Sequence, residues 1–298
     1  MMNILITGGT GLVGTALVKK LKERNHTVRI LTRSESEEEN EFYWNIAEKK
    51  IDDKAFENLD CIIHLAGANI SERWTDDYKK ELYSSRIDSA DLLREYCAEK
   101  GIHLKSFISS SGVNYYGTFT SDQILTEDSE IVENDFLAKL CVAWENAADQ
   151  FESIAERVVC LRTAVVLARK GGAFPLLKKT VNLNIGSGVG TGKQWMNWIH
   201  IDDLANMYME AAENTSFNGK YNAVADKIVT NEVFMKKLAK AADKFFLPFN
   251  VPPFVMKSVF GEMSSIILEG TRADNKKIKS QGFDFKYSTV DEAFKNLV

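Results

Sequence analysis

The amino-acid sequence predicts an α/β fold with a doubly wound parallel sheet and a smaller C-terminal α/β lobe. Two observations predict this fold. Short apolar segments alternate with segments of helical spacing through the first half of the 298 residues, which is typical of parallel strands joined by helices. Beyond residue 165 glycine-rich stretches interrupt this alternation, and prolines cluster near residue 250. We therefore expect a sheet domain followed by a lobe of different construction.

Composition excludes several classes of protein. The net charge is −5 and no basic stripe is present, which argues against nucleic-acid binding. No apolar run approaches the roughly 18 residues of a membrane span, and the first residues do not resemble a secretion signal. We therefore expect a cytoplasmic protein that acts on a small molecule, without a nucleic-acid or membrane partner and with a homodimer as one option. No metal site is expected, and four widely spaced cysteines are predicted to be buried: Cys61, Cys97, Cys141 and Cys160.

A glycine turn dominates the first fifteen residues. It lies between an apolar strand at residues 2–6 and a helical segment at residues 16–24, and it satisfies both Gly-x-Gly-x-x-Gly and Gly-x-x-Gly-x-x-Gly. Strand, turn and helix in this order are the context of a dinucleotide-binding fingerprint. The glycines permit a tight turn, a close pyrophosphate and a close helix, whose first amides face the anion. The residues expected to hold the dinucleotide here are Gly8, Gly11, Leu12, Val13 and Gly14.

A second strand at residues 27–31 ends at Arg33. Folds that prefer NAD usually place an acidic residue near this position to bind the adenosine ribose. A guanidinium suits the extra phosphate of NADP instead, so the sequence predicts NADP as the cofactor. The alternative is a solvated loop arginine. Residues 35–41 contain five glutamates and are expected to form a solvated loop.

Two further strands are predicted at residues 60–65 and 106–109, separated by helical spacing over residues 75–100. Small residues follow the first of these strands, and a polar, aromatic loop follows the second. Ligands bind at the carboxyl ends of strands in open α/β sheets. The residues expected to contact the cofactor there are Leu65, Ala66, Gly67 and Ser109.

The order of these elements predicts two domains. Residues 1–165 form a Rossmann-like domain that binds NADP, and segments near 197–224 return to it. A helix at residues 136–151 and strands over residues 157–167 complete the first domain. Residues 166–298 form mainly the substrate lobe.

With these residues assembled, the chain resembles an extended short-chain dehydrogenase/reductase, and more narrowly the atypical branch of NAD(P)-dependent epimerase family proteins. The resemblance runs almost from end to end. The turn is shared by the whole superfamily, whereas the Trp-Ile-His-Ile-Asp-Asp and Leu-Cys-x-x-Trp-Glu blocks are typical of the narrow branch. The blocks that carry the resemblance are residues 7–14, 65–68, 111–117, 136–141 with Trp144 and Glu145, 161–163, 192–203 and 261–263.

The resemblance implies a serine or threonine and a Tyr-x-x-x-Lys pair in catalysis, with the tyrosine transferring a proton. Aligning Glu145 with the family's glutamate puts Leu137 at the tyrosine position and Cys141 at the lysine position. Neither side chain can do that chemistry. Lys139 is two residues from the lysine position, which turns it by roughly 200° around the helix.

The candidate catalytic residues come from the loop after the strand at residues 106–109. If Tyr115 matches the tyrosine of the family's Ser-x-x-x-Tyr-Gly segment, Ser111 matches the catalytic serine, and we prefer this alignment. If Tyr116 instead matches that tyrosine, Gly112 falls at the position of the catalytic serine. Tyr115 or Tyr116 could supply the missing phenol, and the alternative is that both rings pack against the lobe interface.

Two departures from the family bear on the ligand. Met196 stands where nucleotide-sugar epimerases often carry an arginine that binds a diphosphate, so a sugar nucleotide is less favoured. Arg86 stands where many members have asparagine. It is a candidate to contact the cofactor or an anionic substrate, and the alternative is an ion pair on a helix surface.

Other polar and aromatic residues receive structural interpretations. His200 is expected to be a core group, and Asp202 or Asp203 to cap the next helix, rather than to form a base or a metal site. The aromatic residues expected to line an apolar crevice are Phe174, Trp195 and Trp198.

These observations predict an NADP-dependent oxidoreductase or epimerase-like enzyme that acts by hydride transfer on a small carbonyl or alcohol substrate. The missing Tyr-x-x-x-Lys pair keeps open a catalytically silent NADP-binding sensor or scaffold. A nucleotide-sugar epimerase is the third alternative.

Overall fold

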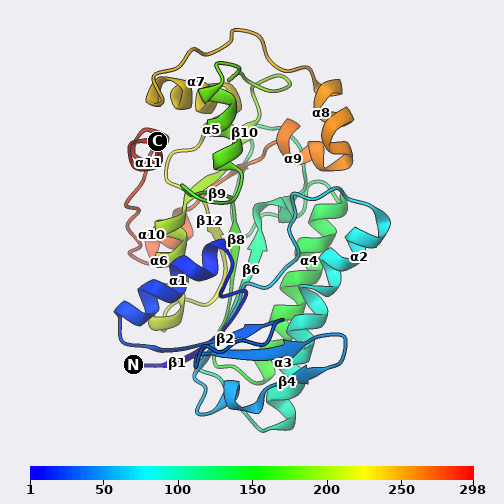
Figure 1. Cartoon of the computed structure of the whole chain (residues 1–298), viewed down its shortest axis with the longest axis vertical. Helices are drawn as coiled ribbons and strands as arrows, with labels where there is room; N and C mark the ends of the chain where they lie inside the picture. Colours follow the sequence, from blue (N-terminus) through cyan, green and yellow to red (C-terminus); the bar gives the residue numbers. More distant parts are fainter.

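The main sheet of the computed structural model, which describes residues 1–298, has eight strands in the order β12-β8-β6-β5-β1-β2-β3-β4 (Figure 1). Neighbouring strands are parallel except for the pair β3 and β4. The chain moves outward to one side from β1 to β2 and then returns to the other side at β5, so the order reverses between β1 and β5. This confirms the doubly wound α/β prediction and places the switch point, where such sheets bind ligands, at β1 and β5. The strands are β1 (Asn3–Thr7), β2 (Thr27–Thr32), β3 (Glu41–Asn45), β4 (Lys50–Ile51), β5 (Cys61–His64), β6 (Ser106–Gly112), β8 (Val158–Thr163) and β12 (Gly219–Ala223).

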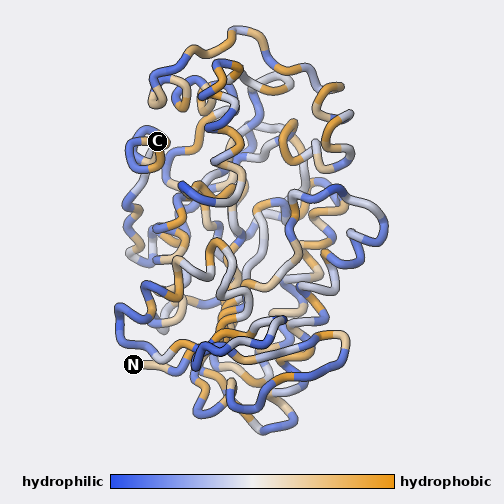
Figure 2. Tube along the Cα trace, in the orientation of Figure 1, coloured by the Kyte–Doolittle hydropathy of each residue, from blue (hydrophilic) through white to orange (hydrophobic).

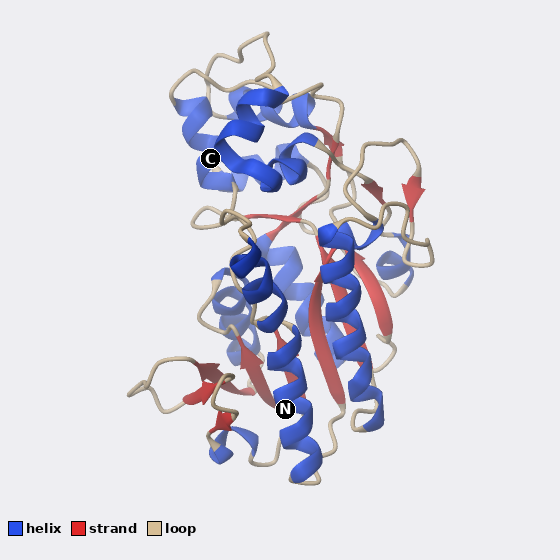
Figure 3. Cartoon of the chain, turned by 90° about the vertical axis from the view of Figure 1, so that its right-hand side faces the viewer, coloured by secondary structure: helices blue, strands red, loops and turns tan.

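Helices cover both faces of this sheet. Helices α1 (Leu12–Glu23) and α6 (Ile201–Glu213) pack on one face, and α3 (Ile87–Glu99) and α4 (Phe136–Asp149) on the other (Figure 1). Figure 3 shows helices in front of and behind the strands of this sheet. Figure 2 shows hydrophobic residues concentrated along the central strands between them. All four cysteines are free and buried, as the sequence predicts. No helix combines the length and the apolar character needed to cross a bilayer.

The C-terminal part forms a second group of helices above the carboxyl ends of the strands (Figure 1). Its core contains Phe174, Trp198, Phe234 and Phe294. Besides α6, the helices after residue 173 are α5 (Phe174–Asn182), α7 (Asn231–Ala241), α8 (Pro253–Phe260), α9 (Ser265–Leu268), α10 (Lys276–Ser280) and α11 (Val290–Leu297). Three two-stranded sheets join β10 (Trp195–Met196) to β13 (Val229–Thr230), β9 (Val165–Leu167) to β11 (Trp198–His200), and β7 (Ile124–Leu125) to β14 (Arg272–Ala273).

The structure corrects the single helix predicted over residues 75–100. The segment forms two helices, α2 (Asp76–Ser84) and α3, with a break at Ser85 and Arg86. The Ser89 hydroxyl donates to the carbonyl of Ser85 at 2.7 Å, and the Arg86 guanidinium donates to that of Leu82 at 3.0 Å. These side chains bond carbonyl groups near the interruption and compete with the helical backbone pattern.

Three other boundaries also differ from the prediction. Helix α1 begins at residue 12 rather than 16, directly after the glycine turn, and β3 and β4 add an edge to the sheet that the sequence did not reveal. Of the two segments expected to return to the first domain, 219–223 joins the main sheet, whereas 198–200 pairs only with β9. The division at residue 165 stays a prediction.

Candidate functional site

The glycine turn packs against the carboxyl end of β5 and leaves no room for side chains. A Cβ atom on Gly14 would collide with the carbonyl oxygen of Gly8, and one on Gly8 would lie 2.9 Å from the carbonyl group of Leu65. Gly8 also has a φ of 69°, which L side chains rarely adopt. A Cβ on Gly9 would come within 2.7 Å of Ile30. The turn therefore has the close backbone packing that a pyrophosphate-binding turn requires.

Helix α1 presents unpaired backbone donors beside this turn. Its N-cap, Gly11, has no side chain to bond them. The Gly11 amide donates to the carbonyl of Gly8 at 3.0 Å, but the amides of Leu12, Val13 and Gly14 have no acceptor in the chain. Free donors at the positive end of a helix dipole suit an anionic group. The turn and the helix start thus fit the pyrophosphate of a dinucleotide.

A buried histidine ties β1, β5 and α3 together at the switch point. His64 Nε2 lies 3.1 Å from the carbonyl oxygen of Arg86, which can only accept, so Nε2 carries the proton. His64 Nδ1 then accepts from Thr7 Oγ1 at 2.8 Å, and Thr7 Oγ1 accepts from the amide of Ala66 at 3.1 Å. Burial lowers the pKa of His64 to about 4, so the ring is neutral near pH 7. Sequence reasoning missed Thr7 and His64, although polar residues that end apolar strands were a usable signal.

The predicted strand-end residues differ in access. Leu65 and Ala66 are half-buried and Gly67 is exposed at the end of β5, so these residues lie at the ligand-binding edge of the sheet. Ser109 is buried within β6, and its hydroxyl donates to the carbonyl of Ser110 at 2.9 Å. The structure therefore keeps the Ser109 hydroxyl inside the protein.

Arg33 lies directly after β2, at the same edge of the sheet as the glycine turn. Its side chain is exposed and forms no ion pair. The neighbouring glutamates at positions 35 and 37–39 are also exposed. The guanidinium is thus free to meet a phosphate from solvent.

Arg86 is buried beside the loop that follows β5. It is 7% exposed and donates to the carbonyl oxygens of Leu82 and Ala68, each at 3.0 Å. The guanidinium carbon lies 4.8 Å from the centre of the Trp144 ring. Because no carboxylate pairs with it and solvent hardly reaches it, the predicted alternative of a helix-surface ion pair is wrong.

Ser111 is part of a buried ion-pair network. Its hydroxyl donates to Glu145 Oε1 at 2.7 Å. Arg162 donates to both oxygens of Glu145, at 2.9 and 3.0 Å. Although burial opposes the charge of the guanidinium, hydrogen bonds to Glu145 raise the pKa of Arg162 above its ordinary value. The single Ser111 proton is thus committed to the Glu145 carboxylate.

The two predicted tyrosines have different surroundings. Tyr116 is fully buried, where its hydroxyl accepts from Arg162 at 3.0 Å and donates to Asn222 at 2.8 Å. Burial raises the pKa of Tyr116 to about 12. Tyr115 is half-buried, its ring lies 3.5 Å from the Arg162 guanidinium carbon, and its hydroxyl has no partner in the chain. The packing interpretation thus suits Tyr116, whereas the Tyr115 hydroxyl is uncommitted.

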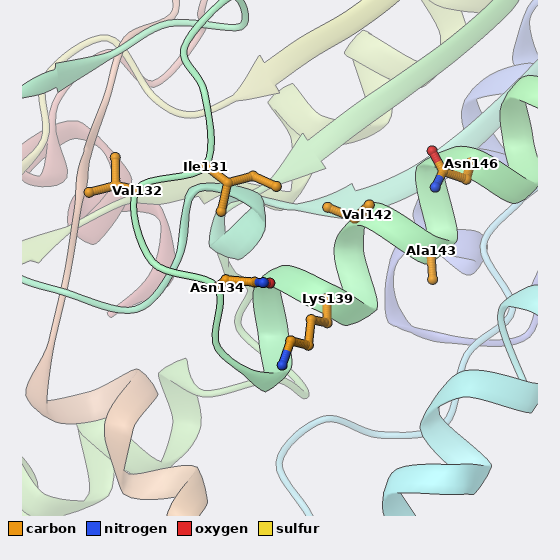
Figure 4. Close-up of a pocket in the computed structure, with 7 residues that line it drawn as sticks. All are labelled: Ile131, Val132, Asn134, Lys139, Val142, Ala143 and Asn146. Carbon is orange, nitrogen blue, oxygen red and sulfur yellow. The ribbon is translucent and has the colours of Figure 1, made fainter.

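Helix α4 lacks a proton donor and a cation on its inner face. Leu137 and Cys141 are both buried there, and burial raises the pKa of the Cys141 thiol to about 12. Lys139 is exposed on the outer face, as its helical angle predicts. Figure 4 shows it beside a surface hollow of about 530 Å³. The other residues that line this hollow are Ile131, Val132, Asn134, Val142, Ala143 and Asn146.

Comparison with known proteins identifies the family. Residues 4–224 match the model of the NAD dependent epimerase/dehydratase family. The chain belongs to this family. Residues 251–297 also match a domain of unknown function, DUF1731. The chain is 35% identical to the Epimerase family protein SAR0825 of Staphylococcus aureus (strain MRSA252), over all of this chain and 99% of that protein, and 35% identical to the Epimerase family protein YfhF of Bacillus subtilis (strain 168), over all of this chain and 98% of that one.

Solved structures agree with this membership. The human epimerase family protein SDR39U1, crystallised with NADPH, superposes with a TM-score of 0.89 at 30% identity over 99% of both chains. A nucleoside-diphosphate sugar epimerase from Corynebacterium glutamicum gives 0.81 at 30% identity, over 99% of this chain and 57% of that one. A UDP-glucuronic acid 4-epimerase from Bacillus cereus, 18% identical, gives 0.78 and shares the fold. The family is that of the extended short-chain dehydrogenases/reductases, with a nicotinamide cofactor.

Several residues near the second lobe differ from the sequence predictions. His200, rather than Asp202 or Asp203, caps α6, because its ring accepts from the amide of Asp202 at 3.1 Å. Asp203 instead accepts from the amides of Lys286 and Tyr287. A buried carboxylate is stable there because it satisfies two backbone donors that would otherwise be orphaned.

The predicted apolar crevice is also corrected. Phe174 and Trp198 are fully buried in the core of the second lobe, so they cannot line a crevice. Trp195 is half-buried and donates to Asp122 at 3.1 Å. In a segment of mixed composition the sequence does not distinguish buried aromatic residues from exposed ones. Only the tertiary packing decides which rings lie in the core.

Proposed function

We propose that the protein is an NADP-dependent oxidoreductase or epimerase-like enzyme that acts by hydride transfer on a small carbonyl or alcohol substrate. The observation that carries the proposal is the glycine turn with three free amides at the switch point of the sheet. The cofactor supplies the hydride chemistry when it is bound. The free guanidinium of Arg33 favours NADP, as does the relative crystallised with NADPH.

Different residues of this chain have different roles in the proposed cofactor site. The amides of Leu12, Val13 and Gly14 bind the pyrophosphate, and Arg33 binds the additional phosphate of NADP. Leu65, Ala66 and Gly67 form the surface across which the cofactor lies. The hydrogen bonds of His64 keep this surface in register with the turn.

Proton transfer is assigned to Tyr115. Of the three predicted catalytic side chains, Tyr115 alone has a hydroxyl without a partner in the chain, because Ser111 is bonded to Glu145 and Tyr116 to Arg162 and Asn222. Ser111 would have to leave Glu145 before it could polarise a carbonyl group. Its buried hydroxyl therefore supports the site instead of contacting substrate.

Titration of the purified protein with NADPH and NADH, followed by calorimetry, tests the cofactor assignment. NADPH should bind more tightly, and Arg33→Ala should lower its affinity by about tenfold to a hundredfold because a charge-assisted hydrogen bond is lost. Arg24→Ala is a matched control, since Arg24 is also exposed but lies at the opposite end of β2. Equal affinity of the wild type for the two nucleotides would remove the NADP assignment.

A catalytically silent NADP-binding sensor or scaffold is the second candidate. It is favoured by the buried Leu137 and Cys141, which leave α4 without the usual proton donor and cation. Incubation with NADPH and a broad panel of carbonyl compounds separates the two. Reproducible oxidation of NADPH that Tyr115→Phe abolishes would exclude the silent protein, and no turnover across the panel would favour it.

A nucleotide-sugar epimerase is the third candidate, supported by the similarity to the enzyme from Corynebacterium glutamicum. Met196 opposes it. Its side chain is half-buried, and its sulfur lies 3.7 Å from Asn231 Nδ2, so the position offers packing and no cation for a diphosphate. A rise in melting temperature with UDP-glucose would revive this candidate, and no shift would dismiss it.

A further inference from the structure

Arg86 and Trp144, which contact each other, each carry a buried N–H group without an acceptor. Neither Arg86 Nε nor Trp144 Nε1 has a hydrogen-bond partner, although each atom is shielded from solvent. The guanidinium carbon of Arg86 lies 4.8 Å from the centre of the Trp144 ring. A buried polar group without a partner costs about 1–3 kcal/mol, and such groups are uncommon in native proteins. Unpaired donors on two side chains in contact indicate an acceptor that comes from outside the chain.

The charge of this site points to an anionic acceptor. The other N–H groups of Arg86 donate to the neutral carbonyl oxygens of Leu82 and Ala68 and to the Ser85 hydroxyl. No carboxylate forms an ion pair with the guanidinium. A buried cation without a counter-ion is unfavourable. An anionic ligand would supply the missing charge and oxygen atoms that can accept from these donors.

The position of the pair relates it to the dinucleotide site. A Cβ atom on the exposed Gly67 would lie 2.9 Å from the guanidinium carbon of Arg86, so the cation lies directly against the loop at the carboxyl end of β5. Trp144 follows Cys141 by one helical turn and shares its side of α4. Cys141 stands where the family has its lysine. The cation of Arg86 is therefore next to the position from which the lysine is missing.

We propose that Arg86 and Trp144 form a subsite for an anionic oxygen, a phosphate or carboxylate oxygen that comes from the cofactor or from the substrate. Arg86 then supplies the fixed positive charge that Cys141 cannot. This subsite rests on the proposed function, because it would belong to the same ligand-binding site at the carboxyl ends of the strands. Its two sources of oxygen are separable by experiment.

The first experiment is calorimetric titration of NADPH into the wild type, Arg86→Met, Arg86→Lys and Trp144→Phe. Trp144→Phe keeps an aromatic ring at the position and removes the indole N–H together with part of the ring system. If the cofactor provides the oxygen, the affinity for NADPH falls about tenfold to a hundredfold in Arg86→Met and less in Trp144→Phe. Inorganic pyrophosphate then competes with NADPH in the wild type more strongly than in Arg86→Met.

A matched control is Arg157→Met. Arg157, like Arg86, donates only to uncharged groups, here the carbonyl oxygens of Ala211, Ala212 and Phe217, but it precedes β8 at the opposite edge of the sheet. This variant should bind NADPH as the wild type does. Circular dichroism verifies that each variant is folded, and Arg86→Lys, which keeps the charge but lacks Nε–H, serves if Arg86→Met does not fold.

The second experiment distinguishes the substrate as the source. If NADPH affinity is the same in all variants, malonate and inorganic phosphate are titrated into the NADPH-loaded proteins and the melting temperature is measured. The anions should then raise the melting temperature of the wild type and lose this effect in Arg86→Met. Equal NADPH affinity together with equal anion effects in wild type and variants would overturn the subsite. A wild type that does not bind NADPH would refute the proposed function alone, because the same anion titrations, performed on the unliganded wild type and Arg86→Met, still test the subsite.

Discussion

Arg162 and Arg86 are both buried guanidinium groups that contact side chains of α4, yet their partners differ. Arg162 forms two hydrogen bonds to the Glu145 carboxylate and another to Tyr116. Arg86 bonds only uncharged groups and keeps an unpaired Nε–H. A cation whose charge and donors are satisfied within the chain stabilises the fold, whereas one left unsatisfied is available to a ligand. Burial alone therefore does not tell a structural arginine from a binding arginine.

The largest expected effect comes from breaking the Arg162 pair. Glu145→Gln leaves the guanidinium buried without a counter-ion, so the free energy of unfolding should fall by about 3–5 kcal/mol. Urea denaturation measures the change. Glu99→Gln, at an exposed position of α3, is the control and should have little effect. A loss below about 1 kcal/mol would show that the pair is not structural.

His64, which bonds the carbonyl oxygen of Arg86, should make the free energy of unfolding depend on pH. Burial lowers the pKa of His64 to about 4 in the folded protein, from 6.5. Between these values the unfolded chain binds more protons than the folded one, so the free energy of unfolding decreases as the pH falls from 6.5 to 4. The loss should be on the order of 3 kcal/mol.

Urea midpoints at several pH values measure this dependence. His64→Asn should flatten the decrease, and His103→Asn, at an exposed position, should leave it unchanged. If His64→Asn keeps the full slope of the wild type, another group is responsible and His64 does not act as described.

Ser111→Ala distinguishes support of the Arg162 network from contact with substrate. The variant removes one hydrogen bond to a charged group, which should lower the free energy of unfolding by about 2 kcal/mol. NADPH affinity should not change, because the hydroxyl faces Glu145. Unchanged stability with lost turnover would instead restore Ser111 as a catalytic residue.

The smallest expected effect on stability is that of Arg86→Met. The variant loses two hydrogen bonds to carbonyl oxygens, but it also removes a buried charge without a counter-ion, so the free energy of unfolding should stay within about 1 kcal/mol of the wild type. The same urea experiment, performed beside Glu145→Gln, measures the contrast. Equal losses in the two variants would abolish the distinction between the two arginines.

The sequence predicted those parts of the site that depend on neighbours in the chain. The strand, glycine turn and helix at residues 3–23 are contiguous, and their spacing restricts the backbone so strongly that the turn was identifiable without a structure. The outward direction of Lys139 followed from helical geometry alone. The helix spacing over residues 75–100 was less informative, because it did not reveal the break that places Arg86 in the interior.

By itself the sequence determined the doubly wound fold and the dinucleotide turn, since both are encoded in local residue order, and it showed leucine and cysteine at positions 137 and 141 instead of the family's tyrosine and lysine. Only the tertiary structure decided which hydroxyls and charges remain free. Ser111 contacts Glu145 across 34 positions of the chain, and Arg86, in the break between α2 and α3, contacts Trp144 on α4. Such partners depend on how the helices pack on the sheet, because a hydrogen bond requires contact within about 3 Å and spacing along the chain does not give that distance.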